Sequence, residues 1–345
     1  MNSLNSSKKI PLTNNSKIYV LCPAFFKTGG TELLHQYVFT LKKNGFDVYM
    51  VYPGNNEKGI NPAFNEYINE YINFSEIIDE EQNVLVVPEV FTDYLRFFNN
   101  IKTVIWWESV DNYLVNISPL FRIKLRMYKG ALKLFIKKIL NKCKHYKISE
   151  LKKATYHFVQ SYYALDFLNK NSISNNVFYV SDYVNDIYLN NNPSYESRDK
   201  VVLYNPKKGL YFTKKIISCD KKHSYIPIVN MSNSQVFNLL NKSMVYIDFG
   251  NHPGKDRFPR EAAKCGCCII TNKNGSAKFY NDIPIPADYK FDSKKKNIMK
   301  IIKTIDDCIE NYNEKINDFE SYRIFINSEK ESFEKDVISC YEIFD

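Results

Sequence analysis

The strongest constraint on the fold is a repeated alternation of short apolar runs with longer amphipathic stretches. Between the short runs, apolar residues recur at helical spacing, as in Thr31–Asn44. Strands separated by helices form parallel βαβ units, so the sequence predicts an α/β protein. The short runs, rich in residues that favour strands, are Lys17–Cys22, Asp47–Tyr52, Asn83–Pro88, Thr103–Trp107, Tyr156–Ser161, Val177–Val180, Val201–Tyr204, His223–Ile228, Met244–Asp248 and Cys267–Thr271.

A polar stretch rich in Asn and Ser, Asp186–Lys200, divides this alternation into two series. A chain of 345 residues is long enough for two domains of ordinary size. Polar segments between periodic series are typical of linkers. We therefore predict two α/β halves joined by a linker and followed by a polar helical tail.

The net charge of +9 comes from one segment, residues 121–149, which holds ten Lys or Arg and no Asp or Glu. Its apolar residues recur at spacings of three and four, which predicts a basic amphipathic helix over 121–149. That helix has three interpretations: a peripheral helix on an anionic membrane, a solvated basic face over a packed helix, or a patch for an acidic acceptor or nucleic acid. No nucleic-acid reader motif accompanies the charge, so no nucleic-acid partner is predicted.

Cysteine usage and the termini bear on the compartment. The eight cysteines form no regular framework, and Cys267 and Cys268 lie in an apolar run, which favours reduced thiols in the core and a reducing compartment. Residues 1–16 are polar and lack the apolar centre of a secretory signal. We expect a cytoplasmic protein, with peripheral attachment to the inner face of the cell membrane as an alternative.

Two glycine-containing loops each follow a predicted strand and precede a predicted helix. In the first, Gly29 and Gly30 permit a tight turn and leave helix N–H groups for an anion or a sugar oxygen. It is not a G-x-G-x-x-G sequence, which disfavours a nicotinamide cofactor. In the second, Lys207 and Lys208 precede Gly209, where lysines can reach phosphate groups. Each loop could also be an ordinary turn.

The segment Asp248–Gly266 carries the densest group of functional side chains. A loop with His252, Lys255, Asp256 and Arg257 follows a strand, and a helix is predicted to begin near Pro259 and end at Gly266. Glu261 lies in its first turn, and the loop Asn274–Lys278 follows the next strand. Ligands of open α/β sheets bind outside the carboxyl ends of the strands, so these loops are expected to line one site.

These pieces together resemble the glycosyltransferases of the GT-B fold. The resemblance is greatest to the large retaining family that includes sucrose synthases and many bacterial lipopolysaccharide and capsule enzymes. It implies two Rossmann-like domains facing across a cleft: an acceptor-side domain over 1–185 and a nucleotide-sugar domain over 186–325. A C-terminal helix over 326–345 would pack back on the first domain. The matching motifs are Gly29-Gly30, Lys208-Gly209, Pro259-x-Glu261-Ala262-x-x-x-Gly266 and Gly275-Ser276.

The resemblance also implies roles for single residues. Glu261 would hold the ribose hydroxyls, and Pro253 stands where relatives have a glutamate that contacts the donor sugar. Asp256 or Asp248 could compensate for that missing carboxylate. The remaining donor-binding residues implied are Gly29, Gly30, Lys207, Lys208, Gly275, Ser276 and Ala277.

The expected chemistry is the stabilisation of negative charge on a departing nucleoside diphosphate. Fixed cations can do this without a metal ion, and Lys208, Lys255 and Arg257 are the candidates. Asp256 and His252 complete the predicted catalytic group, and no cofactor or metal is expected. If the reaction inverts configuration, a base is needed, which Glu32, Glu108 or Asp111 could supply. Trp107 could pack against a sugar ring or lie in the core.

The sequence therefore predicts an enzyme that moves a sugar from a nucleotide-diphosphate donor to a cell-surface glycan such as lipooligosaccharide or capsule, with retention of configuration. Its partners would be the nucleotide-sugar donor and a glycan or glycolipid acceptor. Two alternatives stay open: an epimerase-like or phosphorylase enzyme on the same fold, and a degenerate, non-catalytic GT-B binding protein.

Overall fold

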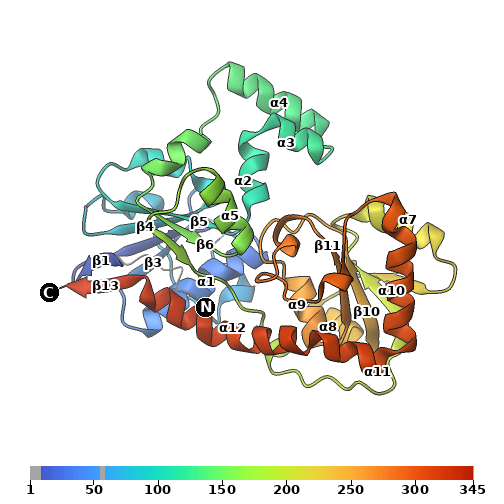
Figure 1. The fold of residues 1–345 in the computed structure, drawn as a ribbon. Helices are drawn as coiled ribbons and strands as arrows, with labels where there is room; N and C mark the ends of the chain where they lie inside the picture. The colour runs from blue at the N-terminus through green and yellow to red at the C-terminus, as the bar shows by residue number, and fades with distance from the viewer. Residues whose placement is uncertain (1–8, 55–58, 345) are drawn as a thin grey trace. The chain divides into compact units, whose positions relative to one another are not determined.

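The computed structural model describes residues 9–54 and 59–344. The chain divides into two compact units. The first comprises the chain up to Asp182 together with the residues from Glu331 onward, and the second is Tyr183–Lys330. Each unit has its own sheet and its own helices (Figure 1).

The described part of the first unit contains a six-stranded sheet in the order β3-β2-β4-β5-β6-β7. All neighbouring strands are parallel. The strands are β2 (Ile18–Leu21), β3 (Val48–Val51), β4 (Val84–Pro88), β5 (Lys102–Trp107), β6 (Tyr156–Val159) and β7 (Val177–Tyr179). The helices are α1 (Gly29–Lys43), α2 (Val110–Ile117), α3 (Pro119–Lys124), α4 (Tyr128–Ile139) and α5 (Tyr162–Lys170).

The second unit contains a five-stranded parallel sheet in the order β12-β11-β10-β8-β9. The strands are β8 (Asp199–Tyr204), β9 (Ser224–Pro227), β10 (Ser243–Asp248), β11 (Cys268–Asn272) and β12 (Lys290–Phe291). The helices are α6 (Asp186–Leu189), α7 (Leu210–Cys219), α8 (Asn233–Lys242), α9 (Arg257–Lys264), α10 (Ile298–Glu310), α11 (Tyr312–Lys315) and α12 (Glu320–Ser339), the last of which continues into the first unit.

The two parallel sheets confirm the predicted α/β class with two Rossmann-like units. Strands of a parallel sheet are buried on both faces, so their sequences are continuous apolar runs. Such runs make these strands easy to predict from the sequence. Burial is complete along β4 and β11, for example. Short strands were missed: β12, and the pair β1 (Ile10–Thr13) and β13 (Tyr341–Phe344), which lie parallel to each other in the first unit.

The predicted basic helix over 121–149 is wrong as a continuous element. Helix α3 ends at Lys124, α4 runs from Tyr128 to Ile139, and Arg126 between them has a left-handed backbone with φ +62°. A non-glycine residue in that conformation ends a regular helix. The dense positive charge also lacks acidic partners at helical spacing, which disfavours one long helix. No helix in the described part of the chain is long and apolar enough to cross a bilayer.

The segment predicted as a linker, Asp186–Lys200, instead packs into the second unit. The buried guanidinium of Arg198 donates hydrogen bonds to the carbonyls of Leu240, Ser243 and Cys265. The C-terminal tail is also not helical to its end, because α12 stops at Ser339 and β13 follows.

Candidate active site

Three loops meet at the carboxyl ends of β8, β10 and β11, which are neighbours in the sheet of the second unit. They are Asn205–Gly209, Phe249–Asp256 and Asn274–Lys278. The sequence predicted that the loops after β10 and β11 line one site, since the carboxyl ends of parallel strands share one edge. Among the described residues, Lys207 is exposed, whereas Lys208 is half-buried.

Backbone packing holds the three loops together. Gly209 (φ +64°) lies so close to Phe249 that a Cβ atom would overlap the Phe249 carbonyl. Gly275 (φ +51°) is equally close to the carbonyl of His252. Only glycine adopts this left-handed conformation without strain, and here it also permits the close approach. Ser276 adds a backbone N–H bond to the His252 carbonyl (2.9 Å) and an Oγ bond to the Gly254 carbonyl (2.6 Å).

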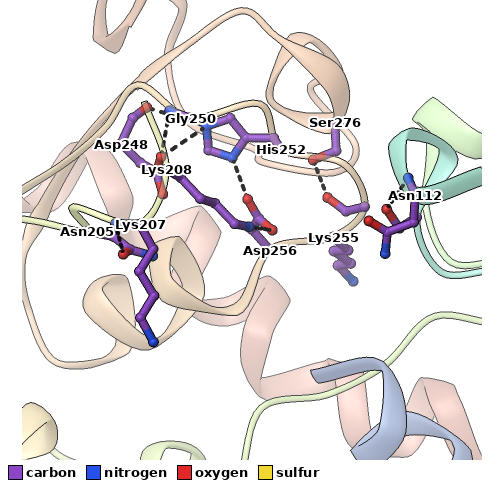
Figure 2. Close-up of polar contacts among 12 residues, drawn as sticks. Asn112, Asn205, Lys207, Lys208, Asp248, Gly250, His252, Lys255, Asp256 and Ser276 are labelled. Atoms are coloured by element: carbon purple, nitrogen blue, oxygen red, sulfur yellow. Dashed lines mark hydrogen bonds and ion pairs between the residues drawn. The ribbon is translucent and has the colours of Figure 1, made fainter. Parts of the chain in front are cut away.

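A chain of alternating charges runs through this packed region (Figure 2). The Nζ of Lys208 lies 2.6 Å from Asp256 Oδ1, and Asp256 Oδ2 lies 3.1 Å from Nδ1 of His252. Nε2 of His252 lies 3.6 Å from Asp248 Oδ1. The His252 side chain is fully buried, whereas Lys208 keeps 37% of its side chain exposed. The ammonium of Lys208 is therefore the end of the chain that a ligand can reach.

The pKa values of this chain follow from its charges. Burial acts to lower the pKa of His252, but the nearby charges of Asp248 and Asp256 outweigh burial and raise it above its usual value. Burial acts to raise the pKa of Asp256, but Lys208 and His252 outweigh burial and lower it to about 2. A protonated imidazole between two carboxylates is the arrangement that both shifts support.

The same three side chains, Asp248, His252 and Asp256, are close enough for their ligand atoms to hold one metal ion. Metal binding requires a neutral imidazole, however, and the raised pKa of His252 favours the protonated ring. The ammonium of Lys208 also occupies Oδ1 of Asp256. This donor set is poorly suited to a divalent cation, and a metal-independent reaction stays a prediction.

Lys255 does not reach the surface of the loop, contrary to its predicted role as a phosphate-binding cation. Its side chain is 2% exposed, and its ammonium lies 2.7 Å from Oε1 of Glu329 on α12. Arg260 is fully buried and contacts Oε2 of the same carboxylate at 2.9 Å. It also donates to the Lys255 carbonyl at 2.9 Å. Lys255 therefore attaches the loop to α12. Sequence reasoning missed Glu329 because its partners lie far away along the chain.

The other predicted donor residues take varied positions. Helix α9 begins at Arg257, slightly earlier than predicted, and both Arg257 and Glu261 are half-buried on it. The backbone N–H groups of Ser276 and Ala277 already donate to the carbonyls of His252 and Asn274. These two buried residues hold the loop through these bonds, and their role in donor binding stays a prediction.

The first unit brings some of its predicted residues together. Glu108 follows β5 and lies against Gly30 at the start of α1, where a Cβ atom would overlap the Glu108 carboxylate. Glu32, also at the start of α1, accepts a hydrogen bond from the Tyr67 hydroxyl at 3.4 Å. Asp111 is buried and accepts a hydrogen bond from the Tyr163 hydroxyl at 2.9 Å.

Trp107 cannot stack on a sugar, because it is fully buried and donates to Nδ1 of His157 at 3.1 Å. The sequence also missed Glu89, which follows β4 and is 2% exposed. Its carboxylate accepts the backbone N–H of Glu108 at 3.1 Å, and burial raises its pKa to about 7. Glu89 thus holds the turn that carries Glu108. Its position after a strand end was the available signal.

No protein-family model and no curated protein matches the sequence. Solved structures do match over nearly the whole chain. HepE from Anabaena, solved with UDP-glucose, has a TM-score of 0.58 at 14% identity and covers 94% of this chain and 98% of its own. Sucrose-phosphate synthase from Thermosynechococcus elongatus has a TM-score of 0.52 at 12% identity and covers 94% and 95%. An α-glucosyltransferase solved with UDP and a 13-mer DNA has a TM-score of 0.54 at 10% identity and covers 94% and 99%.

The chain has the GT-B fold. This confirms the resemblance drawn from the four short motifs. The GT-B likeness concerns the fold, while the roles of single residues rest on the geometry of the loops. In this GT-B chain the charge cluster around Lys208 lies in the second unit, which is the one that the resemblance assigns to the nucleotide-sugar.

Proposed function

We propose that this chain is a nucleotide-sugar glycosyltransferase that binds the donor diphosphate at Asn205–Gly209 and Phe249–Asp256. The observation that carries the proposal is the Lys208–Asp256–His252–Asp248 chain, which ends in an accessible ammonium at the carboxyl edge of a Rossmann-like sheet. The GT-B fold supports it, because HepE was solved with UDP-glucose and the α-glucosyltransferase with UDP.

In the proposed reaction Lys208 stabilises the negative charge that develops on the departing diphosphate. Asp256 holds the ammonium from one side, and the positive charge of His252 keeps Asp256 ionised. Helix α7 begins directly after Gly209, so its first N–H groups add positive potential. Arg257 is the second candidate cation, and Glu261 is the proposed ligand of the ribose hydroxyls. Fixed charges of this kind act without rearrangement when the bond breaks.

We further propose that the acceptor is a cell-surface glycan or glycolipid and that the configuration of the sugar is retained. Both points rest on the resemblance of the short motifs. The burial of Asp111 and its bond to Tyr163 make this carboxylate a poor general base, which leaves Glu32 and Glu108 as the candidates if the configuration were inverted. The anomeric configuration of an isolated product, measured by NMR, tests the second point.

The decisive experiment is a thermal-shift and calorimetric screen of uridine, guanosine, adenosine and cytidine diphosphate sugars. Any that binds the folded protein raises its melting temperature. Lys208→Ala is expected to weaken binding of the selected donor at least about tenfold, as the loss of a charged hydrogen bond predicts. Lys214→Ala, which removes an exposed lysine of α7, is the matched control. If no nucleotide binds, the proposal fails.

The second candidate function is that of a non-catalytic binding protein, and Pro253 favours it because this residue stands at the position of a family glutamate. Donor binding without either transfer or hydrolysis would support that candidate. An epimerase-like enzyme would instead release an epimerised sugar without any acceptor. Chromatography of the products from one labelled donor separates the three outcomes.

A further inference from the structure

The helices α3 and α4 expose apolar side chains that a globular protein ordinarily covers. In Figure 1 this pair projects from the sheet of the first unit. On α4, Ala131 and Leu134 are buried and the other large apolar side chains are not. The exposed large apolar side chains of α3, of α4 and of the residues that directly flank α4 are, with their exposed fractions, Leu120 78%, Ile123 47%, Met127 43%, Tyr128 63%, Leu132 63%, Phe135 53%, Ile136 47%, Ile139 67% and Leu140 55%.

The exposed side chains of α4 lie on one face. Positions 128, 132, 135, 136 and 139 follow helical spacing, so they form one continuous stripe. Lys129 and Lys133 each follow a member of the stripe by one position and border it on one side, and Lys137 lies further round the helix on that side. Lys138 lies on the opposite side, and all four lysines are exposed. We call the stripe and its bordering lysines the α4 face.

The charge around the α4 face has one sign. Residues 121–149 contain ten Lys or Arg and no Asp or Glu. A second copy of the chain would bring like charges together across a twofold interface, which is unfavourable. An anionic bilayer offers both components that the face requires, since headgroups attract the lysines and the interface accepts apolar side chains.

We propose that the α4 face attaches this protein to an anionic membrane surface, with Leu132, Phe135 and Ile139 entering the interface and the lysines contacting headgroups. The break at Arg126 is part of this arrangement, because it lets α3 fold against α4 and adds Leu120 and Ile123 to the exposed apolar area. The inference concerns location and does not depend on the proposed reaction.

The test is sedimentation of the full chain with vesicles of phosphatidylglycerol and phosphatidylcholine, compared with phosphatidylcholine alone. Wild type is expected to bind the anionic vesicles at least about tenfold more tightly, and less so as salt rises. Lys133→Glu with Lys137→Glu is expected to lower this binding at least about tenfold. The matched control, Lys295→Glu with Lys296→Glu, changes the net charge equally at exposed positions of the second unit and is expected to bind like wild type.

Insertion of the apolar side chains is tested separately by Leu132→Trp. Both native tryptophans, Trp106 and Trp107, are fully buried, so bilayer quenching of the added indole stands out against them. Quenching by brominated lipid is expected for Leu132→Trp and not for wild type. The proposal is overturned if wild type does not bind anionic vesicles, if the lysine variant binds as well as its control, or if the added indole is not quenched. The proposal is also overturned if the protein binds no vesicles but self-associates, and Leu132→Ser with Phe135→Ser abolishes the self-association. That result would assign the α4 face to a second copy of the chain.

Discussion

His252 is held between two carboxylates, so its charge contributes to the structure of the site. Its backbone is left-handed with φ +48°, and its carbonyl accepts the Ser276 N–H. A residue with a strained backbone, here with a carboxylate on each side of its ring, persists only where the surrounding structure holds it in place. The protonation of His252 should therefore affect stability and the position of Asp256 together.

The raised pKa of His252 makes the stability of the protein depend on pH. A raised pKa in the folded state gives stability that is fully present below the unfolded value, about 6.5, and is lost as pH rises through the folded value. Wild type should therefore lose stability as the pH rises above about 6.5, and His252→Asn should show a smaller loss. Urea denaturation at a series of pH values from below 6.5 upward measures both.

His157 provides a control, because its pKa is shifted in the opposite direction from that of His252. Burial lowers its pKa to about 4, so it costs stability only as the pH falls below about 6.5. His157→Gln should therefore change the acid side of the stability profile and leave the alkaline side as in wild type. An alkaline slope that is unchanged in His252→Asn would contradict the protonated bridge between Asp248 and Asp256.

At the residue scale, the sequence could locate the charged loop but could not assign its members. Lys255 and Asp256 are adjacent, yet one side chain is enclosed with Glu329 and the other holds Lys208. Which way each points depends on α12 and on the loop after β8, both remote in the sequence. Local pattern carries no information about such partners, and Trp107 was ambiguous for the same reason.

At the element scale, Glu329 joins α12 to the loop after β10 and to α9. Glu329→Gln removes the negative charge that contacts both buried cations, Lys255 and Arg260, so it is expected to cost about 3–5 kcal/mol. Glu331→Gln on the same helix removes only an exposed pair with Lys335 and should leave the free energy of unfolding close to that of wild type. Chemical denaturation of both variants gives the comparison. Equal losses would mean that the buried cluster is not a stabilising attachment.

Gly209 and Gly275 allow the loops of the site to touch one another. Gly209→Ala and Gly275→Ala would each place a methyl group against a backbone carbonyl, so they should displace the loops and reduce nucleotide binding at least about tenfold. Gly45→Ala has the same left-handed strain (φ +82°) but no atom within 4 Å of the added carbon. Calorimetry should find its nucleotide affinity unchanged. Normal affinity in the first two variants would show that the contact of the loops is dispensable.

Strands were the elements most predictable from sequence, because those buried on both faces must be apolar throughout. The division between α3 and α4 was not, since Phe121, Leu125, Tyr128 and Leu132 fit one helical stripe across the break. The left-handed turn at Arg126 goes with the packing of α3 on α4, and the spacing of the apolar residues does not predict it. Periodicity thus predicted helical structure correctly and its continuity wrongly.

At the scale of the whole molecule, the chain leaves the first unit after Asp182 and returns to it at Glu331. The returning segment places β13 beside β1, and the Tyr341 hydroxyl shares a hydrogen bond with that of Tyr37 on α1. Residues 331–344 therefore complete the core of the first unit. The loops that hold Lys208 and His252 belong to the second unit.

This organisation predicts that damage to the C-terminal strand destabilises the first unit without weakening the donor site. Tyr341 is 5% exposed, so Tyr341→Ala is expected to cost about 3 kcal/mol, the low end for a buried aromatic. Ile343→Ala on the same strand removes a side chain that is 52% exposed and should cost under about 1 kcal/mol. Urea denaturation measures the difference, and calorimetry at a temperature where both variants are folded measures nucleotide affinity. A loss of affinity in Tyr341→Ala, with Ile343→Ala normal, would show that the donor site depends on the first unit and that the two units are not independent in binding.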